Sequence, residues 1–158
     1  ISLWLSNAGS ITTFSVDILY SLPFVSPNNI LLCSIVAAAA LIYFPYLMVA
    51  AGRFQVGYEM GAPRGMFDKL PEYAQRATWA HQNSWESFAL YAPAALMAFV
   101  VAVPAEQVLG TAVVYLVSRV GYSLFYVLDV PILRSLSWAV SISSIVSLFV
   151  ASCQSALV

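Results

Sequence analysis

The chain has 158 residues, of which 61% are hydrophobic and 8% are charged, and its formal net charge is −1 at pH 7. Soluble domains carry about 25% charged residues, so this composition predicts an integral membrane protein made of one helical bundle. The charge gives no indication of nucleic-acid binding. One histidine and two distant cysteines do not form a metal site.

Residues 1–29 contain one acidic residue, Asp17, and no basic residue. They therefore lack the positively charged beginning of a signal peptide. Their serines, asparagines, prolines and aromatic residues predict an arm that lies in the membrane interface or in water. The membrane domain is expected to cover residues 30–158.

Four later stretches are long enough for helices that cross a bilayer, which takes about 20 residues each. They cover residues 30–52, residues 72–103, residues 105–128 and residue 132 to the C-terminus. Short connections join the last three stretches, so neighbouring helices should run antiparallel. The predicted fold is an all-α membrane protein, an antiparallel bundle of four transmembrane helices.

Basic residues gather at one end of this bundle. Arg53, Arg64 and Lys69 lie in the connection after the first stretch, Arg76 follows closely, and Arg134 belongs to the third connection. Because basic residues favour the cytoplasmic side of a membrane, both connections are predicted to be cytoplasmic, or stromal in a thylakoid. Both ends of the chain would then lie on the opposite side.

The second stretch begins with the polar segment "RATWAHQNSWESFALYAP", residues 76–93. Arg76 and Asn83 are seven residues apart and nearly coincide around a helix, and Glu86 falls close to them. Glu86 lies about 20 Å along the helix from its start, at 1.5 Å per residue. The segment therefore predicts a polar stripe that enters the hydrocarbon region.

The third stretch has a matching stripe, "YLVSRVGYSLFY", in which spacings of four, three and four place these residues on one face: Tyr115, Arg119, Tyr122 and Tyr126. A charge at this depth costs several kcal/mol and needs a partner. We therefore expect Glu86 and Arg119 to be buried and to meet directly or through a shared polar group. Two interpretations stay open: a structural network that holds the helices together, or a polar ligand site that opens toward the cytoplasm.

The order of these residues resembles the MAPEG family, membrane-associated proteins in eicosanoid and glutathione metabolism. The resemblance rests on "R…AHxNxxE" in the second stretch, "RxxYxxxY" in the third and an arginine at the start of the fourth. The segment "WAHQNSWESFALYAPAALM" looks closest to bacterial, cyanobacterial and algal members. The resemblance implies a homotrimer of four-helix subunits that hold glutathione between neighbours, near the cytoplasmic side.

The resemblance also implies roles for single residues. Those implied to bind glutathione are Arg76, His81, Asn83, Glu86, Arg119 and Tyr122. The implied catalytic residues are Arg134, which would stabilise the glutathione thiolate, and Tyr126, which would assist. A guanidinium beside the sulfur favours the thiolate, which is the nucleophile. One position departs from the family: Trp79 stands where an arginine, a further carboxylate ligand, is usual.

Two functions follow from this resemblance. The first is a glutathione-dependent transferase or peroxidase that acts on lipophilic substrates entering from the bilayer. The second is a non-catalytic accessory subunit among other membrane subunits, for example in a photosynthetic complex of the thylakoid. The assembly state distinguishes them, because a lone copy among other subunits would lack half of each site between neighbours.

Overall fold

The computed structural model describes residues 27–157, apart from the side chains at positions 27, 28 and 105. The helices in this part of the chain are α2 (Pro27–Gln55), the short 3-10 helix η1 (Phe67–Lys69), α3 (Glu72–Val100), α4 (Ala105–Val127) and α5 (Pro131–Ala156). Each of the four predicted stretches corresponds to one α-helix. The predicted arm, residues 1–29, lies outside the described residues except where α2 begins.

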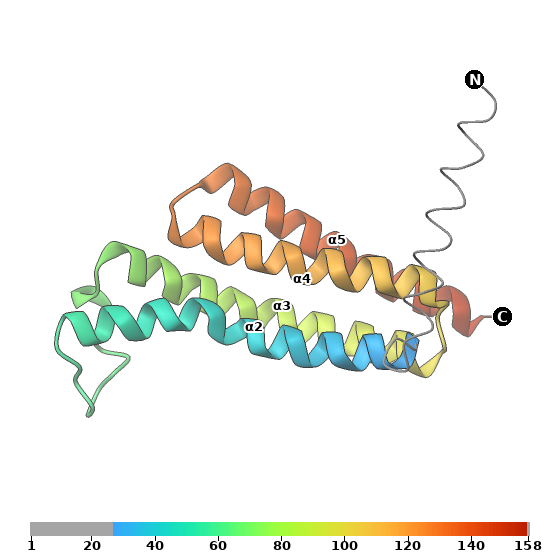
Figure 1. Cartoon of the computed structure of the whole chain (residues 1–158), viewed down its shortest axis with the longest axis horizontal. Helices are drawn as coiled ribbons and strands as arrows, with labels where there is room; N and C mark the ends of the chain where they lie inside the picture. Colours follow the sequence, from blue (N-terminus) through green and yellow to red (C-terminus); the bar gives the residue numbers. More distant parts are fainter. Residues whose placement is uncertain (1–26, 158) are drawn as a thin grey trace, which may run out of the picture.

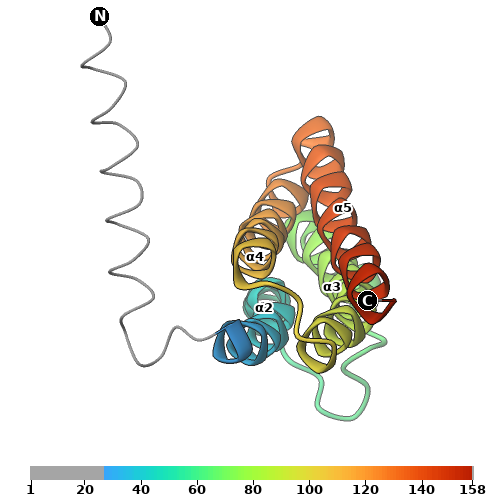
Figure 2. The same cartoon turned by 90° about the vertical axis from the view of Figure 1, so that its right-hand side faces the viewer.

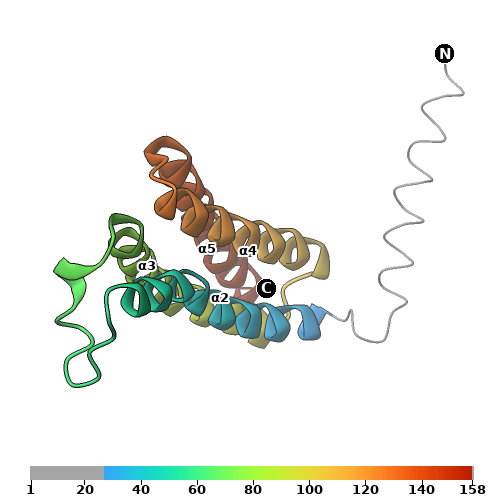
Figure 3. The same ribbon diagram turned by 60° about the vertical axis from the view of Figure 1, so that its left-hand side comes forward.

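The four α-helices form an antiparallel bundle (Figure 1). Helix α2 packs along α3, α4 packs along α5, and the two pairs face each other. Figure 2 looks along the bundle and shows the four helices around its axis, and Figure 3 shows the α2–α3 loop projecting beyond the helix ends. This arrangement confirms the predicted fold class.

Three of the described helices are long and apolar enough to cross a membrane: Asn29–Gln55, Glu106–Val127 and Pro131–Ala156. Helix α3 is as long as α2, with 29 residues each. It falls short in apolar character because its first half carries Glu72, Arg76, His81 and Glu86. At 1.5 Å per residue α3 extends about 43 Å, which exceeds the hydrocarbon thickness of about 30 Å. The polar stripe therefore lowers the mean hydropathy of α3, while the helix remains long enough to cross a membrane.

Helices α3 and α4 end in the same kind of turn. Ala102 and Asp129 occupy the left-handed region, with φ of 53° and 59°. In each turn the next N–H returns to the carbonyl five residues earlier, at 3.0 and 2.9 Å, which is the Schellman pattern. Pro104 and Pro131 follow closely, and proline cannot continue the preceding helix. These turns keep the connections short and the helices antiparallel.

Helices α2 and α3 lie in close contact near the α2–α3 loop. A Cβ placed on Gly52 would collide with the Cβ of Ala74, which is fully buried. Small residues at such contacts let two membrane helices come together. This contact fixes the position of the loop end of α3, where the predicted polar stripe begins.

Candidate functional site

Arg119 is the buried centre of the polar residues, with only 4% of its surface exposed. Its guanidinium donates one hydrogen bond to Asn83 Oδ1 at 3.1 Å and another to Ser84 Oγ at 3.3 Å. The Cζ atom also lies 4.4 Å from the centroid of the Tyr122 ring, a cation–π contact. Arg119 of α4 is thus held against α3 without a direct carboxylate partner.

Asn83 is the shared polar group through which Arg119 and Glu86 meet, one of the two arrangements that the sequence predicted. Its amide Nδ2 donates to Glu86 Oε2 at 3.1 Å, while its Oδ1 accepts from Arg119. The expectation that Glu86 is buried is wrong in this chain, because its side chain is exposed. The reason is its position at the edge of the face that α3 turns toward α4. Glu86 therefore ends the network with a carboxylate that stays exposed in the described part of the subunit.

Four of the predicted site residues line one pocket of about 460 Å³ between α3, α4 and α5. The full lining is Asn83, Tyr122, Tyr126, Arg134, Ser135, Trp138 and Ala139. We call this space the α5 pocket. Arg134 sits in the first turn of α5 and places its Cζ 4.6 Å from the centroid of the Tyr126 ring. Among the described residues, Arg134 makes no ion pair, so its N–H groups remain available to a ligand.

Arg76, which the resemblance implies to bind glutathione, contacts the α4–α5 turn within the subunit. Its Nε donates to the carbonyl oxygen of Val127 at 3.2 Å, and its NH1 lies 3.5 Å from Glu72 and 3.9 Å from Asp129. These contacts tie the start of α3 to the turn between α4 and α5. The α2–α3 loop and the α4–α5 turn therefore lie at the same end of the bundle, as the distribution of basic residues predicted.

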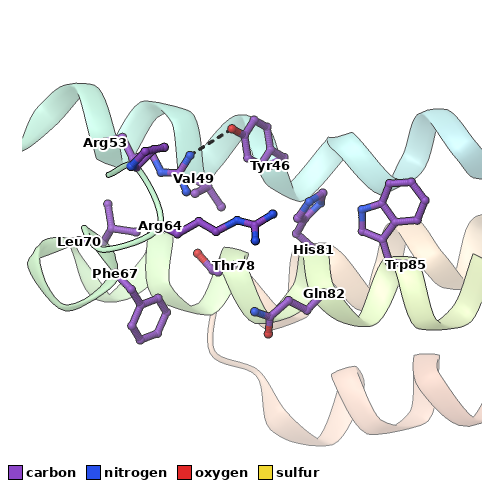
Figure 4. A pocket seen from close by; sticks show the side chains of 11 residues that line it. Tyr46, Val49, Arg53, Arg64, Phe67, Leu70, Thr78, His81, Gln82 and Trp85 are labelled. Atoms are coloured by element: carbon purple, nitrogen blue, oxygen red, sulfur yellow. Dashed lines mark hydrogen bonds between the residues drawn. The ribbon is translucent and has the colours of Figure 1, made fainter. Parts of the chain in front are cut away.

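His81 lies on the other side of α3, facing α2. Its Nδ1 is 2.8 Å from the carbonyl oxygen of Ile42, and its ring lies 5.1 Å from the ring of Tyr46. Figure 4 shows the Arg64 side chain pointing toward His81, with Arg53 farther along α2, in a second pocket that we call the α2 pocket. Within one subunit, His81 and Arg76 thus lie outside the lining of the α5 pocket.

Trp79 extends the aromatic wall next to the α5 pocket. Its ring lies 6.4 Å from Tyr126 and 5.6 Å from Phe67 of η1, and 43% of its surface is exposed. The aromatic contacts continue from Tyr126 to Tyr122 at 5.5 Å. An apolar ring therefore stands where the resemblance implies an arginine.

Sequence reasoning missed several residues of this region. Ser84, which accepts a bond from Arg119, follows Asn83 directly and faces the same helix, so helical geometry would have placed it there. Ser135 and Trp138 line the α5 pocket one turn apart on α5. Arg53 and Arg64 were used only to orient the bundle, and the pocket that they share depends on how the α2–α3 loop folds back.

Residues 30–153 match the model of the MAPEG family. No curated protein and no solved structure matches the chain. The match covers most of the chain and includes α3, α4, nearly all of α2 and α5, and every residue of the α5 pocket. The protein therefore belongs to the MAPEG family, and its four helices are the membrane fold of that family.

Proposed function

We propose that this protein is a glutathione-dependent transferase that acts on lipophilic electrophiles, with its site in the α5 pocket. One observation carries the proposal: Asn83, Tyr122, Tyr126 and Arg134, which come from three helices, line a single pocket. The family membership supports it, because each of these residues fills a position that the resemblance links to glutathione. A peroxidase reaction would use the same residues with a hydroperoxide as the acceptor.

Arg134 would hold the sulfur of glutathione. Its guanidinium lies over Tyr126, so one face rests on an aromatic ring while its N–H edge is left for an anion. A cation beside the sulfur favours the thiolate over the thiol, so more of the bound glutathione is in its nucleophilic form at neutral pH. When the sulfur forms its bond to an electrophilic carbon, the electron pair moves to the leaving group or to an acceptor oxygen. The Tyr126 hydroxyl could donate a hydrogen bond to that charge.

Asn83 and Glu86 would orient the peptide. The Asn83 amide is fixed by Arg119 on one side and by Glu86 on the other, so its direction does not depend on a ligand. The exposed Glu86 carboxylate suits the ammonium of glutathione, because opposite charges pair most strongly when hydrogen bonds already fix one partner. Arg119 would act by positioning Asn83 rather than by touching glutathione.

A homotrimer is part of this proposal. Glutathione carries two carboxylates, and the α5 pocket of one subunit offers one uncommitted arginine, Arg134. Arg76 would have to leave Val127 and Asp129 to supply another. We expect Glu86 at membrane depth from its place along α3, and an exposed carboxylate there requires cover. Both features support neighbouring subunits that close over α3 and complete the site.

The acceptor would reach the α5 pocket from the bilayer. Trp138 lines the pocket, and 45% of its surface is exposed. We infer that an apolar molecule would enter from lipid past this exposed ring. The polar groups of the pocket then face the end of the bundle where the soluble peptide enters.

The proposal is tested with the full chain in detergent micelles or nanodiscs. Conjugation of glutathione to 1-chloro-2,4-dinitrobenzene should be measurable, and Arg134→Gln should lower kcat/KM about 100-fold through lost stabilisation of the sulfur. Lys69→Gln is the matched control, since Lys69 is a cation at the same end of the bundle that pairs with Glu59 outside the pocket. It should leave the rate unchanged.

Calorimetry supplies the outcome that would overturn the enzyme assignment. If the native chain takes up no glutathione at millimolar concentration, the α5 pocket is not a glutathione site. The remaining function would be an accessory subunit of a larger membrane assembly, such as one in a thylakoid. Copurification with other membrane subunits in place of a trimer would support that function.

A further inference from the structure

The α2 pocket is larger than the α5 pocket, at about 630 Å³ against about 460 Å³, and it contains different chemistry. It lies between α2, α3 and the loop that joins them (Figure 4), and its lining shares no residue with that of the α5 pocket. Its lining residues are Tyr46, Val49, Arg53, Pro63, Arg64, Phe67, Leu70, Thr78, His81, Gln82 and Trp85. The volume is in the range typical of small-molecule sites.

The pocket contains cations without anionic partners. Two arginines and a histidine line it, and no carboxylate does. Within residues 27–157, the ion pairs involve Lys69 and Arg76 but neither Arg53 nor Arg64. Arg64 comes from the loop and points toward His81. Positive charges gathered without a counter-ion favour an anionic ligand, since unpaired charges beside a membrane are costly.

Arg53 provides the clearest sign that a ligand is needed. Its NH1 donates to the hydroxyl of Tyr46 at 3.1 Å, which holds the guanidinium at the wall of the pocket. Its Nε is buried and has no hydrogen-bond partner within the described chain. A buried donor without an acceptor is costly, so the described contacts of Arg53 do not fully satisfy its guanidinium.

His81 is oriented by α2. The carbonyl oxygen of Ile42 can only accept a hydrogen bond, so the Nδ1 of His81 must carry the proton that joins them at 2.8 Å. The Nε2 atom is then the ring nitrogen left for other contacts. The ring also packs against Tyr46 and Tyr43, which limits its rotation. His81 thus forms a rigid wall rather than a freely moving side chain.

The rest of the lining suits the part of a ligand that lies in the membrane interface. Tyr46, Phe67 and Trp85 are aromatic, and Trp85 is 47% exposed where the pocket meets the outer surface of α3. Aromatic residues of this kind gather where the headgroups of lipids meet the acyl chains. The pocket therefore offers cations at the end of the bundle and an apolar exit along the helices.

We infer that the α2 pocket binds the phosphate headgroup of an anionic phospholipid, with its acyl chains leaving beside Trp85. Arginines bind phosphate oxygens through paired hydrogen bonds, and basic pockets between membrane helices are suited to such headgroups. The basic residues also place this end of the bundle toward the leaflet that is rich in anionic lipids, if the predicted orientation holds. This inference does not depend on glutathione chemistry in the α5 pocket.

The experiment measures lipid retained by the purified full chain in neutral detergent, by native mass spectrometry. Phosphatidylglycerol and phosphatidylcholine of the same acyl composition are added separately. The native chain should retain phosphatidylglycerol about tenfold more tightly, and Arg64→Gln should remove that preference, because one charge-assisted contact is lost. Arg64 is exposed in the loop and its substitution removes no internal hydrogen bond, so folding should be unaffected.

Lys69→Gln is again the matched control, since it removes one positive charge from the same loop without touching the pocket. It should keep the preference for phosphatidylglycerol. Equal losses in Arg64→Gln and Lys69→Gln would mean diffuse attraction to charge and would overturn the inference. So would equal retention of the two lipids, or displacement of the lipid by inorganic phosphate at millimolar concentration, which would identify free phosphate as the ligand. Displacement by glutathione would assign the pocket to the glutathione site instead.

Discussion

The bundle buries polar side chains in two regions, and the two differ in whether the subunit completes their contacts. The first region lies in the half of the bundle away from the α2–α3 loop. There the Tyr91 hydroxyl donates to Ser34 Oγ at 2.7 Å, Ser87 and Tyr115 share a hydrogen bond at 3.1 Å, and the two tyrosine rings stack at 3.7 Å. These groups are neutral, buried and bonded to one another.

The second region lies nearer the loop and carries charge. Arg119 is buried and bonded to Asn83 and Ser84, but the chain of contacts ends at Glu86, which is exposed. Within residues 27–157, the Arg134 guanidinium and the Tyr126 hydroxyl make no hydrogen bond, and both residues line the α5 pocket. The network is therefore incomplete within one subunit.

This difference separates the two interpretations that the sequence left open. A neutral network that is complete within the subunit holds helices together, because interhelical hydrogen bonds in membranes stabilise packing without needing a ligand. A charged network that ends in an open carboxylate beside a pocket supports a ligand or a neighbouring subunit. The same helices, α3 and α4, thus carry a packing element in one half and the candidate site in the other.

The largest expected effect comes from the packing region. Tyr91→Ala should lower the free energy of unfolding by about 3–5 kcal/mol, because it leaves a cavity against Tyr115 and removes the bond to Ser34. Tyr91→Phe keeps the stack and should cost only about 1 kcal/mol. Denaturation in mixed micelles, followed by circular dichroism, measures both. Glutathione affinity of the folded variants should stay unchanged, and a parallel loss of affinity would contradict the separation of the two regions.

The next largest effect is expected at Arg119, the centre of the charged region. Arg119→Lys should destabilise the chain by about 1–3 kcal/mol, because an ammonium cannot reach Asn83 and Ser84 together as the planar guanidinium does. Here glutathione affinity should fall as well, since Asn83 loses the bond that fixes its amide. Ser84→Ala is the control, because it removes one partner of Arg119 and leaves Asn83 in place. A stability loss with unchanged affinity would show that Arg119 serves packing alone.

The sequence predicted the faces of the helices better than the contacts at their edges. Spacing alone brought Arg119 and Tyr122 onto one face and put Asn83 on the polar stripe of α3, because helical periodicity fixes direction. It failed for Glu86, which sits at the edge of a face, where a small rotation decides between burial and exposure. It also gave Arg76 no specific partner, since the contact with Asp129 depends on how the α4–α5 turn folds.

The α2 pocket shows a second limit of sequence reasoning. Arg53 belongs to a helix, Arg64 to an irregular loop and His81 to another helix. No periodicity relates residues across such a loop, so their common pocket could not be predicted from spacing. By contrast, the residues of the α5 pocket come from three helices with short connections, and short connections make neighbours predictable.

A smaller effect, on glutathione affinity, is expected from substitution of Trp79. Trp79→Arg should tighten glutathione binding about tenfold, which equals 1.4 kcal/mol, the lower limit for one charge-assisted hydrogen bond. Stability should change little, because Trp79 is 43% exposed and makes only ring contacts with Phe67 and Tyr126. Calorimetry of the native chain and the variant measures the change. Trp79→Leu controls for loss of the ring, and equal tightening in both variants would mean that space rather than charge limits binding.

The smallest expected effect is on stability, at the two tight turns that follow α3 and α4. Ala102 and Asp129 adopt the same left-handed conformation, which costs a residue with a Cβ about 1–2 kcal/mol relative to glycine. Ala102→Gly should therefore stabilise the chain by about 1 kcal/mol, after allowance for the greater freedom of glycine in the unfolded chain. Asp129→Gly relieves the same conformation but removes the carboxylate that lies 3.9 Å from Arg76, so its net effect should be near zero. Measured in the same denaturation assay, a gain at Ala102 without one at Asp129 would show that Arg76 contributes to holding the site end of the bundle together. Equal gains would show that Arg76 relies on the carbonyl of Val127 alone and can turn toward a ligand without loss of stability.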